Sequence, residues 1–309
     1  MKTGGKLYFL ATGLALVGLG LLASSGVSAQ QIAFTFDDLP SHGNLPPGET
    51  RLDVANSILA TIHANNLPPV YGFVNGVRTE TDSPTLEVLK AWRNAGQPLG
   101  SHSWSHMSLN DHTPEEFTAD IQKNEPLLQS LMPSEDWHWF RYPFLWEGDT
   151  LDKRHAVRAY LQKHGYRVAQ VTMDFEDYLW NDPYARCMAK HDDASIAWLR
   201  QSYLDTADQF FTLSREMSKT LYGRDIPYVL LMHIGAFDAK MLPELIALYK
   251  NHGVTFISLE QAERDKAYSE DPDMALKHGG TLIEQMMAAR NLKVPPGSKP
   301  YKQLEAICR

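Results

Sequence analysis

Two adjacent aspartates, Asp37 and Asp38, follow the apolar and β-branched run 33–36 and precede Leu39-Pro40. Such a run, bounded by charge and then by proline, predicts a short strand that stops here. Neighbouring side chains of a regular strand point to opposite faces. At a fraying strand end, one carboxylate could therefore bind a metal ion while the other stands away from it as a base.

A histidine pair could complete such a metal site. His102 and His106 are four residues apart, so one helical turn after a strand would place both imidazoles on one face. Together with one carboxylate they would make a set of two histidines and one aspartate. Three protein ligands with an open fourth position are typical of catalytic metal sites. The alternative is two ordinary surface or core histidines.

Two more polar side chains lie in apolar runs. Arg141 comes just before Pro143 at the end of one run, an awkward place for a cation unless a carboxylate pairs with it. The alternative there is a plain ion pair that closes the rim of the fold. His233 lies within the apolar run 229–234, where the alternative is a core histidine bonded to the backbone.

The elements that would position these residues alternate between strand and helix patterns. The expected strands cover residues 31–38, 69–74, 98–102, 139–143, 167–174, 228–234 and 254–259. The expected helices cover residues 51–66, 83–95, a tract from 113, 150–164, 192–221, 242–251 and 282–290. This order predicts repeated βα units and a parallel barrel. A parallel barrel carries its chemistry at the carboxyl ends of its strands, where these polar groups cluster.

The strand ends together resemble the polysaccharide deacetylase family, also called the NodB homology domain or carbohydrate esterase family 4. The matching pieces are Thr35-Phe36-Asp37-Asp38, His102-Ser103-Trp104-Ser105-His106, Arg141-Tyr142-Pro143-Phe144, Asp174-Phe175-Glu176-Asp177-Tyr178 and Leu231-Met232-His233. They occur in the order of the family and span about residues 31–259. The resemblance implies a distorted (β/α)7 barrel and metal-dependent removal of acetyl groups from N-acetylated sugars.

The resemblance also implies a metal site and an oxyanion donor. Asp38, His102 and His106 match the metal triad, which would hold one divalent ion, usually zinc, with cobalt or manganese as alternatives. The backbone N–H of Phe144 matches the donor that stabilises the oxyanion. A metal bound through two neutral imidazoles and one carboxylate keeps a net positive charge, which lowers the pKa of its water.

The proton-transfer groups follow from the same resemblance. Asp37 matches the general base, and Arg141 matches the residue that orients it. His233 matches the general acid that protonates the leaving amine. Asp177 is the first choice for the carboxylate paired with this histidine, and Asp174 is the second.

The chain departs from the family pattern around the expected substrate pocket. Tyr178 follows Asp177 where the family commonly has tryptophan, which puts the shape of the acetyl pocket in doubt. The loop 39–50, rich in proline and glycine, and the long insertion 180–227 could narrow the groove. His42 in that loop could contact substrate or be an ordinary solvent-exposed histidine. Four tryptophans could stack on sugar faces or pack in the core: Trp104, Trp139, Trp146 and Trp180.

The N-terminus predicts export. Residues 1–29 combine a basic start, a largely apolar run and small residues before Ala29, as in a secretory signal cleaved after that residue. An uncleaved membrane anchor is the alternative. The expected product is secreted or periplasmic and not stably inserted in a membrane. It would comprise a barrel over residues 30–265 and a C-terminal helical extension over residues 266–309 packed on it.

Charge and cysteine content narrow the partners. The leader holds two lysines and no acid, so the mature chain would carry 27 basic against 37 acidic residues, a net charge of −10. Without any basic run, this charge argues against nucleic acid or anionic lipid as a partner. Cys187 and Cys308 are the only cysteines. In an oxidising compartment they could pair and tie the C-terminal tail to the body; otherwise they are two free thiols.

The expected function is that of an exported, metal-dependent N-deacetylase of a chitin-like or peptidoglycan-like glycan. One alternative keeps the fold but hydrolyses non-peptide carbon–nitrogen bonds in a small amide. The other is a glycan-binding protein without catalysis. A purely binding protein needs no base, acid and metal triad, so the complete set favours an enzyme. The sequence leaves open the glycan, the metal and the oligomeric state.

Overall fold

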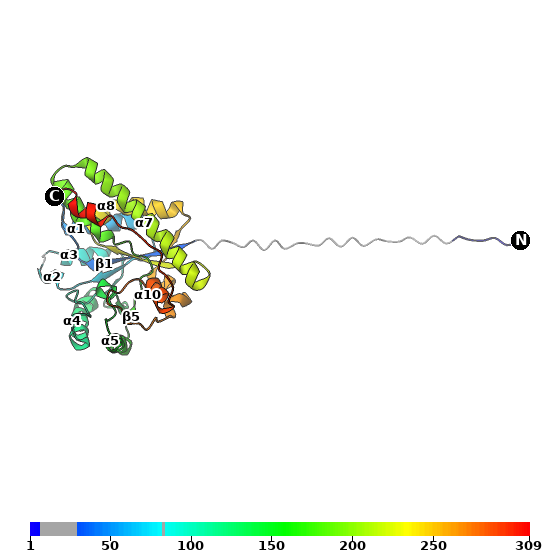
Figure 1. Cartoon of the computed structure of the whole chain (residues 1–309), viewed down its shortest axis with the longest axis horizontal. Coiled ribbons are helices and arrows are strands. Elements are labelled where there is room, and N and C mark those ends of the chain that lie inside the picture. Colours follow the sequence, from blue (N-terminus) through cyan, green and yellow to red (C-terminus); the bar gives the residue numbers. More distant parts are fainter. Residues whose placement is uncertain (7–29, 82–83) are drawn as a thin grey trace.

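The computed structural model describes residues 1–6, 30–81 and 84–309 (Figure 1). The apolar run and the cleavage site of the expected leader lie outside these residues. Within the described part of the chain, no helix has both the length and the apolar character needed to cross a membrane.

Seven parallel strands form one curled sheet. They are β1 Gln31–Leu39, β2 Tyr71–Val74, β3 Leu99–Ser101, β4 Trp139–Phe140, β5 Arg167–Val168, β6 Tyr228–His233 and β7 Thr255–Phe256. Their order is β5-β4-β3-β2-β1-β6, and β7 pairs with the start of β1. Because β1 and β6 are in register, Asp37 lies opposite His233 at the carboxyl end of the sheet. The fold is therefore a distorted (β/α)7 barrel, as the sequence predicts.

The expected fifth strand lies where the two ends of the sheet, β4–β5 and β6, come together and close the barrel. Its first part, Arg167–Val168, pairs with β4, while Met173 forms a single parallel bridge to Leu230 of β6. The chain between them bends from one neighbour to the other, and Thr172 donates its N–H to Val229. The regular strand is consequently shorter than residues 167–174.

Helices cover the outside of the barrel (Figure 1). They are α1 Arg51–Ala64, α2 Arg78–Thr81, α3 Leu86–Asn94, α4 Pro114–Leu131, α5 Leu151–Lys163, α6 Asn181–Ala189, α7 Asp193–Tyr222, α8 Ala236–Asn251, α9 Leu259–Ala262, α10 Leu282–Ala289 and α11 Tyr301–Ala306, with short 3₁₀ turns η1 Pro143–Leu145, η2 Asp177–Trp180 and η3 Lys266–Ser269. Threonines with a reciprocal acidic partner begin α1 and α4. Helix α8 begins six residues earlier than expected, because Tyr203 and Asn181 satisfy the buried Asp238 in its first turn.

Strand β1 divides the core into two layers. Phe34 and Phe36 pack outward against the helices, whereas Ala33 belongs to the cluster inside the barrel. The alternation of a strand then places Thr35 and Asp37 on the inner side as well. Both are buried. Asp37 thus lies on a largely buried strand.

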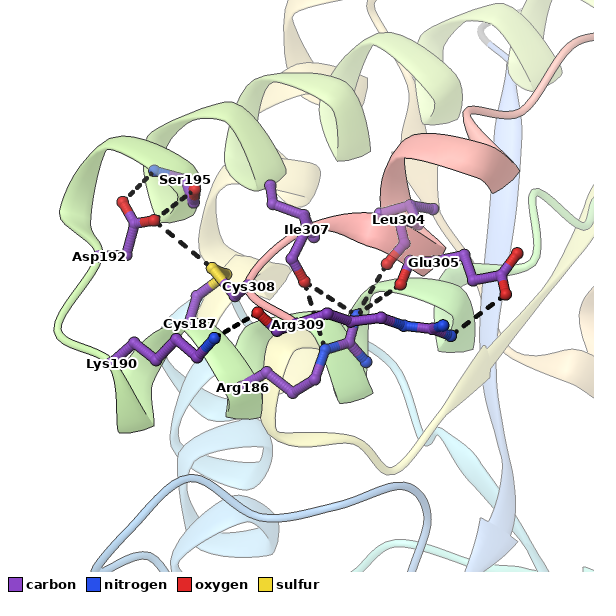
Figure 2. The surroundings of a disulfide bond; sticks show 10 residues. All are labelled: Arg186, Cys187, Lys190, Asp192, Ser195, Leu304, Glu305, Ile307, Cys308 and Arg309. Atoms are coloured by element: carbon purple, nitrogen blue, oxygen red, sulfur yellow. Dashed lines mark hydrogen bonds and ion pairs between the residues drawn. A yellow bond between two sulfur atoms is a disulfide. The ribbon is translucent and has the colours of Figure 1, made fainter.

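The C-terminal segment returns to the barrel and is fixed at its end. Figure 1 shows it running from α10 to the side of the molecule where α7 and α8 lie. Cys308 forms a disulfide bond with Cys187 of α6 (Figure 2). Arg186 beside it donates to the carbonyl oxygens of Leu304 and Ile307. The bond ties the tail to the body, the first of the two possibilities that the sequence leaves open.

Candidate active site

Both aspartates of β1 reach one cavity of about 650 Å³ at the carboxyl ends of the strands. Simple alternation would turn Asp38 away from the side of Asp37. The backbone of Asp38 instead has a φ of 63°, in the left-handed region that non-glycine residues seldom adopt. This local turn brings the second carboxylate to the same cavity as the first.

Arg141 holds Asp37 inside the barrel. Its Nη1 donates to both carboxylate oxygens of Asp37, at 3.1 and 3.3 Å. Its other donors reach the hydroxyl of Thr35 and the carbonyl of Ala169, and its guanidinium lies over the ring of Phe73. Arg141 is 1% exposed. With all three donor groups engaged, the arginine fixes the orientation of the Asp37 carboxylate.

The two histidines come from a loop and not from the expected helical turn. After β3, Ser103 and His106 have φ values of 62° and 59°, which a right-handed helix excludes. The side chain of Asn124 donates to the carbonyl of Ser103 and supports the loop from below. His102 and His106 still face the same point, with ring centroids 4.9 Å apart. The expected proximity therefore holds, although its geometric reason was wrong.

Asp38, His102 and His106 fit a divalent metal ion. Their ligand atoms all lie within 4.8 Å of one another. The Oδ1 of Asp38 is buried without a hydrogen-bond partner, 3.5 Å from the Nε2 of His102 and 3.3 Å from that of His106. An orphaned buried carboxylate oxygen beside two imidazoles is an arrangement that a bound cation satisfies.

The tautomer of His102 and the lowered pKa of His106 are both compatible with binding of this divalent ion. The Nδ1 of His102 lies 2.8 Å from the carbonyl oxygen of Arg141, which can only accept, so this nitrogen carries the proton. Its Nε2 therefore turns a lone pair toward Asp38. Burial, with the nearby imidazoles of His102 and His233, lowers the pKa of His106 to about 4, although Asp38 acts to raise it. The ring of His106 is therefore neutral near pH 7.

His233 stands across the cavity with its own carboxylate. Its Nδ1 lies 2.8 Å from the Oδ1 of Asp177, whose Oδ2 accepts the backbone N–H of His233 at 2.6 Å. Burial acts to lower the pKa of His233, but the charge and hydrogen bond of Asp177 outweigh it and raise the pKa to about 10. The imidazolium is therefore stable at neutral pH.

Asp174, the second candidate for the carboxylate paired with His233, makes a different hydrogen bond. One of its oxygens accepts the backbone N–H of Glu176 at 2.7 Å, and the side chain lines the cavity. Burial raises the pKa of Asp174 to about 6. Phe144, expected to supply a backbone donor, also lines the cavity with a φ of 59° and its ring 4.4 Å from that of His106.

His42, expected either to contact substrate or to be an ordinary solvent-exposed histidine, contacts a candidate metal ligand. The Nδ1 of His42 lies 2.7 Å from the Oδ2 of Asp38, and its ring is 4.8 Å from that of His233. Burial by itself raises the pKa of Asp38, but this hydrogen bond and the surrounding histidines hold it well below its usual range. Only its position four residues after Asp38 could have indicated this contact. Of the four tryptophans considered, Trp146 alone lines the cavity.

Comparison with known proteins agrees with this geometry. The sequence model of the polysaccharide deacetylase family matches residues 25–169. A chitin deacetylase of Arthroderma benhamiae is 25% identical over 147 residues, which are 48% of this chain and 35% of that protein. The chain thus matches about a third of the length of this curated relative.

Solved structures share the fold at low sequence identity. The chitin deacetylase of Colletotrichum lindemuthianum is 17% identical, with a TM-score of 0.51 over 76% of this chain and 87% of that one. A carbohydrate esterase family 4 pseudoenzyme of Bacillus anthracis is 14% identical, with a TM-score of 0.53 over 76% and 66%. Residues 25–169, just under half of the chain, thus match the polysaccharide deacetylase family, and the barrel is shared with these solved structures.

Proposed function

We propose that this protein is a metal-dependent hydrolase that removes N-acetyl groups from an extracytoplasmic glycan of the chitin or peptidoglycan type. One observation carries the proposal: a fixed carboxylate and a charged imidazole face each other across one cavity, beside a three-ligand metal set. Amide hydrolysis needs both a base for the attacking water and an acid for the leaving amine.

Asp37 is the general base in this proposal. Its Oδ2 lies 3.8 Å from the Nε2 of His102, so the carboxylate stands beside the metal ligands without joining their set. Arg141 keeps it in one orientation. Asp37 takes a proton from the water whose oxygen bonds to the acetyl carbon, and Arg141 balances the charge of the carboxylate before the transfer.

His233 is the general acid. The carbon–nitrogen bond breaks as the nitrogen receives the Nε2 proton of His233, because an amine leaves poorly as an anion. Asp177 holds the other ring nitrogen and keeps the ring charged until that step. The backbone N–H of Phe144 would donate to the oxyanion of the tetrahedral intermediate. The products are acetate and the free amine of the sugar.

Asp38, His102 and His106 would hold the divalent ion, for which we propose zinc, with cobalt or manganese as alternatives. When bound, such an ion polarises the amide carbonyl and lowers the pKa of water. His42 and the carbonyl of Arg141 orient two of the ligands from behind.

The disulfide supports a place outside the cytoplasm. Stable disulfides form in oxidising compartments and are rare in the cytosol. Together with the expected leader, the bond between Cys187 and Cys308 favours a secreted or periplasmic protein. We also propose that the leader ends at Ala29, and that residues 30–265 form the catalytic barrel with residues 266–309 as its extension.

An acetate-release screen tests the proposed function. The purified protein would be incubated with chitooligosaccharides, peptidoglycan fragments and small acetamides, each with added zinc, cobalt or manganese. Acetate from the glycans, absent with Asp37→Asn, is the expected result. Release from small amides alone would instead favour the hydrolase of small carbon–nitrogen compounds. Glycan binding without any acetate would indicate a binding protein.

A further inference from the structure

The C-terminal segment from Leu276 to Lys299 forms one wall of the catalytic cavity. Ten of the residues that line the cavity come from this segment, among them Leu276, His278, Gly279 and Lys299. The sequence match to the family ends at residue 169, far before this wall begins. The shape of the cavity therefore depends on a part of the chain outside the family match.

The wall is anchored on one side to the loop after β4. Gly279 packs so closely against this loop that a Cβ atom there would lie 2.4 Å from the carbonyl oxygen of Leu145 and 2.6 Å from the ring of Trp146. Gly279 also has a φ of 57°, a conformation that favours glycine. The ring of His278 lies 6.3 Å from that of Trp146. This end of the wall therefore packs directly against the loop after β4.

The other side is anchored to the loop after β5. Lys299 forms an ion pair of 3.0 Å with Glu176, and the hydroxyl of Tyr301 donates to the same carboxylate at 2.7 Å. Lys299 also lies over the ring of Phe210 at 4.3 Å. Beyond these contacts, the disulfide of Cys308 fixes the end of the segment to α6 (Figure 2). The segment thus bridges the loops that follow two neighbouring strands.

We infer that this C-terminal wall restricts the site to the terminal unit of a glycan or to a short oligosaccharide, and excludes internal units of a long chain. The inference rests on the proposed deacetylase function and names its substrate class. A polymer bound through an internal unit needs a groove open on both sides of the catalytic groups. Here the passage between the β4 and β5 loops is crossed by the wall.

The size and surface of the cavity agree with a short substrate. Its volume of about 650 Å³ lies within the range of roughly 300–1,000 Å³ that is typical of sites for small molecules. Phe144 and Trp146, with ring centroids 5.0 Å apart, and Tyr178 offer aromatic surface near the catalytic groups. Such rings stack on the apolar faces of a few sugar units, so affinity need not come from a long groove.

The test compares positions of deacetylation along one substrate. Chitohexaose labelled at its reducing end would be treated with the full-length, metal-loaded protein, and mass spectrometry would locate each free amine. We expect deacetylation at one terminal unit, favoured over internal units by at least about tenfold. Comparable rates at internal units would overturn the inference while leaving the deacetylase function intact. No acetate from any glycan would overturn the function and the inference with it.

Removing contacts that hold the C-terminal wall in place should reduce the preference for the terminal sugar unit. Lys299→Met combined with Tyr301→Phe removes both contacts to Glu176 without altering the base, the acid or the metal ligands. The preference for the terminal unit should fall about tenfold, because one ion pair and one hydrogen bond contribute an amount of that order. Arg200→Met is the matched control, since it removes an exposed ion pair to Glu244 on the outer helices. An unchanged preference in the double variant would show that the wall does not select the substrate.

A second measurement does not depend on turnover. In the Asp37→Asn background, calorimetry should give similar affinities for chitotriose and chitohexaose, because units beyond the wall find no binding surface. Affinity that rises steadily with chain length would contradict the inference, since it would require an open groove.

Discussion

Replacing Asp177 with asparagine should move the alkaline limit of activity to lower pH. The carboxylate lies 2.8 Å from the Nδ1 of His233 and is the main group that raises the pKa of this histidine, to about 10 against an ordinary value of 6.5. Asparagine keeps an oxygen acceptor of the same shape but removes the charge. Burial, which acts to lower the pKa, then dominates.

The size of the effect follows from the two pKa values. At pH 8.5 an acid with a pKa of about 10 is almost fully protonated, whereas one with a pKa of about 6.5 is protonated to roughly one part in a hundred. The variant should therefore lose about a hundredfold in kcat at pH 8.5 and far less at pH 6.

Two measurements check this prediction. Profiles of kcat against pH should show the alkaline limb of the wild type near pH 10 and that of Asp177→Asn near or below pH 6.5. NMR titration of the ring of His233 should report the same shift without any substrate. An alkaline limb at the same pH in both proteins would refute the assignment of His233 as the acid held by Asp177.

The same pair makes a signed prediction for stability. The folded pKa of His233 lies above its unfolded value, so the stabilisation is fully present below about pH 6.5 and is lost as pH rises toward 10. The difference in free energy of unfolding between wild type and Asp177→Asn should shrink over that interval. A difference in free energy of unfolding that grows as the pH rises would contradict this prediction.

The remaining predictions concern the base, the metal site and the disulfide. Asp37→Asn should reduce kcat by roughly 10²- to 10⁴-fold while bound metal, measured by elemental analysis, stays near the wild-type level; full activity would contradict its role as base. His106→Ala should lose both metal and turnover, and an active variant free of metal would rule out the triad. Cys308→Ser should lower the free energy of unfolding by about 2–5 kcal/mol in denaturant titrations. Reductant should destabilise the wild type but not the variant. An equal effect on both proteins would show that the loss of stability in reductant does not come from this disulfide.

The sequence predicted which residues meet because strand order determines it. Apolar runs that end in Asp37, His102, Arg141 and His233 become parallel strands, and parallel strands bring their carboxyl ends to one edge. The residues that meet there could therefore be named without knowing a single torsion angle. The same reasoning predicted the barrel.

What the sequence could not predict depends on local torsions and distant contacts. The left-handed turn at Asp38 and the loop that carries His106 are held by surrounding structure and have no pattern of their own. The contact of His42 with Asp38 depends on the path of the loop between them. Lys299 meets Glu176 across more than a hundred residues, a pairing that no local periodicity encodes.

Activity should depend on a bound metal ion, which removal and return of the metal would show. Protein stripped with a chelator and dialysed should release no acetate from chitooligosaccharides, and one equivalent of zinc, cobalt or manganese per chain should restore the rate. His106→Ala, treated in the same way, should stay inactive. Acetate release that persists at the full rate in metal-free protein would rule out metal-dependent catalysis.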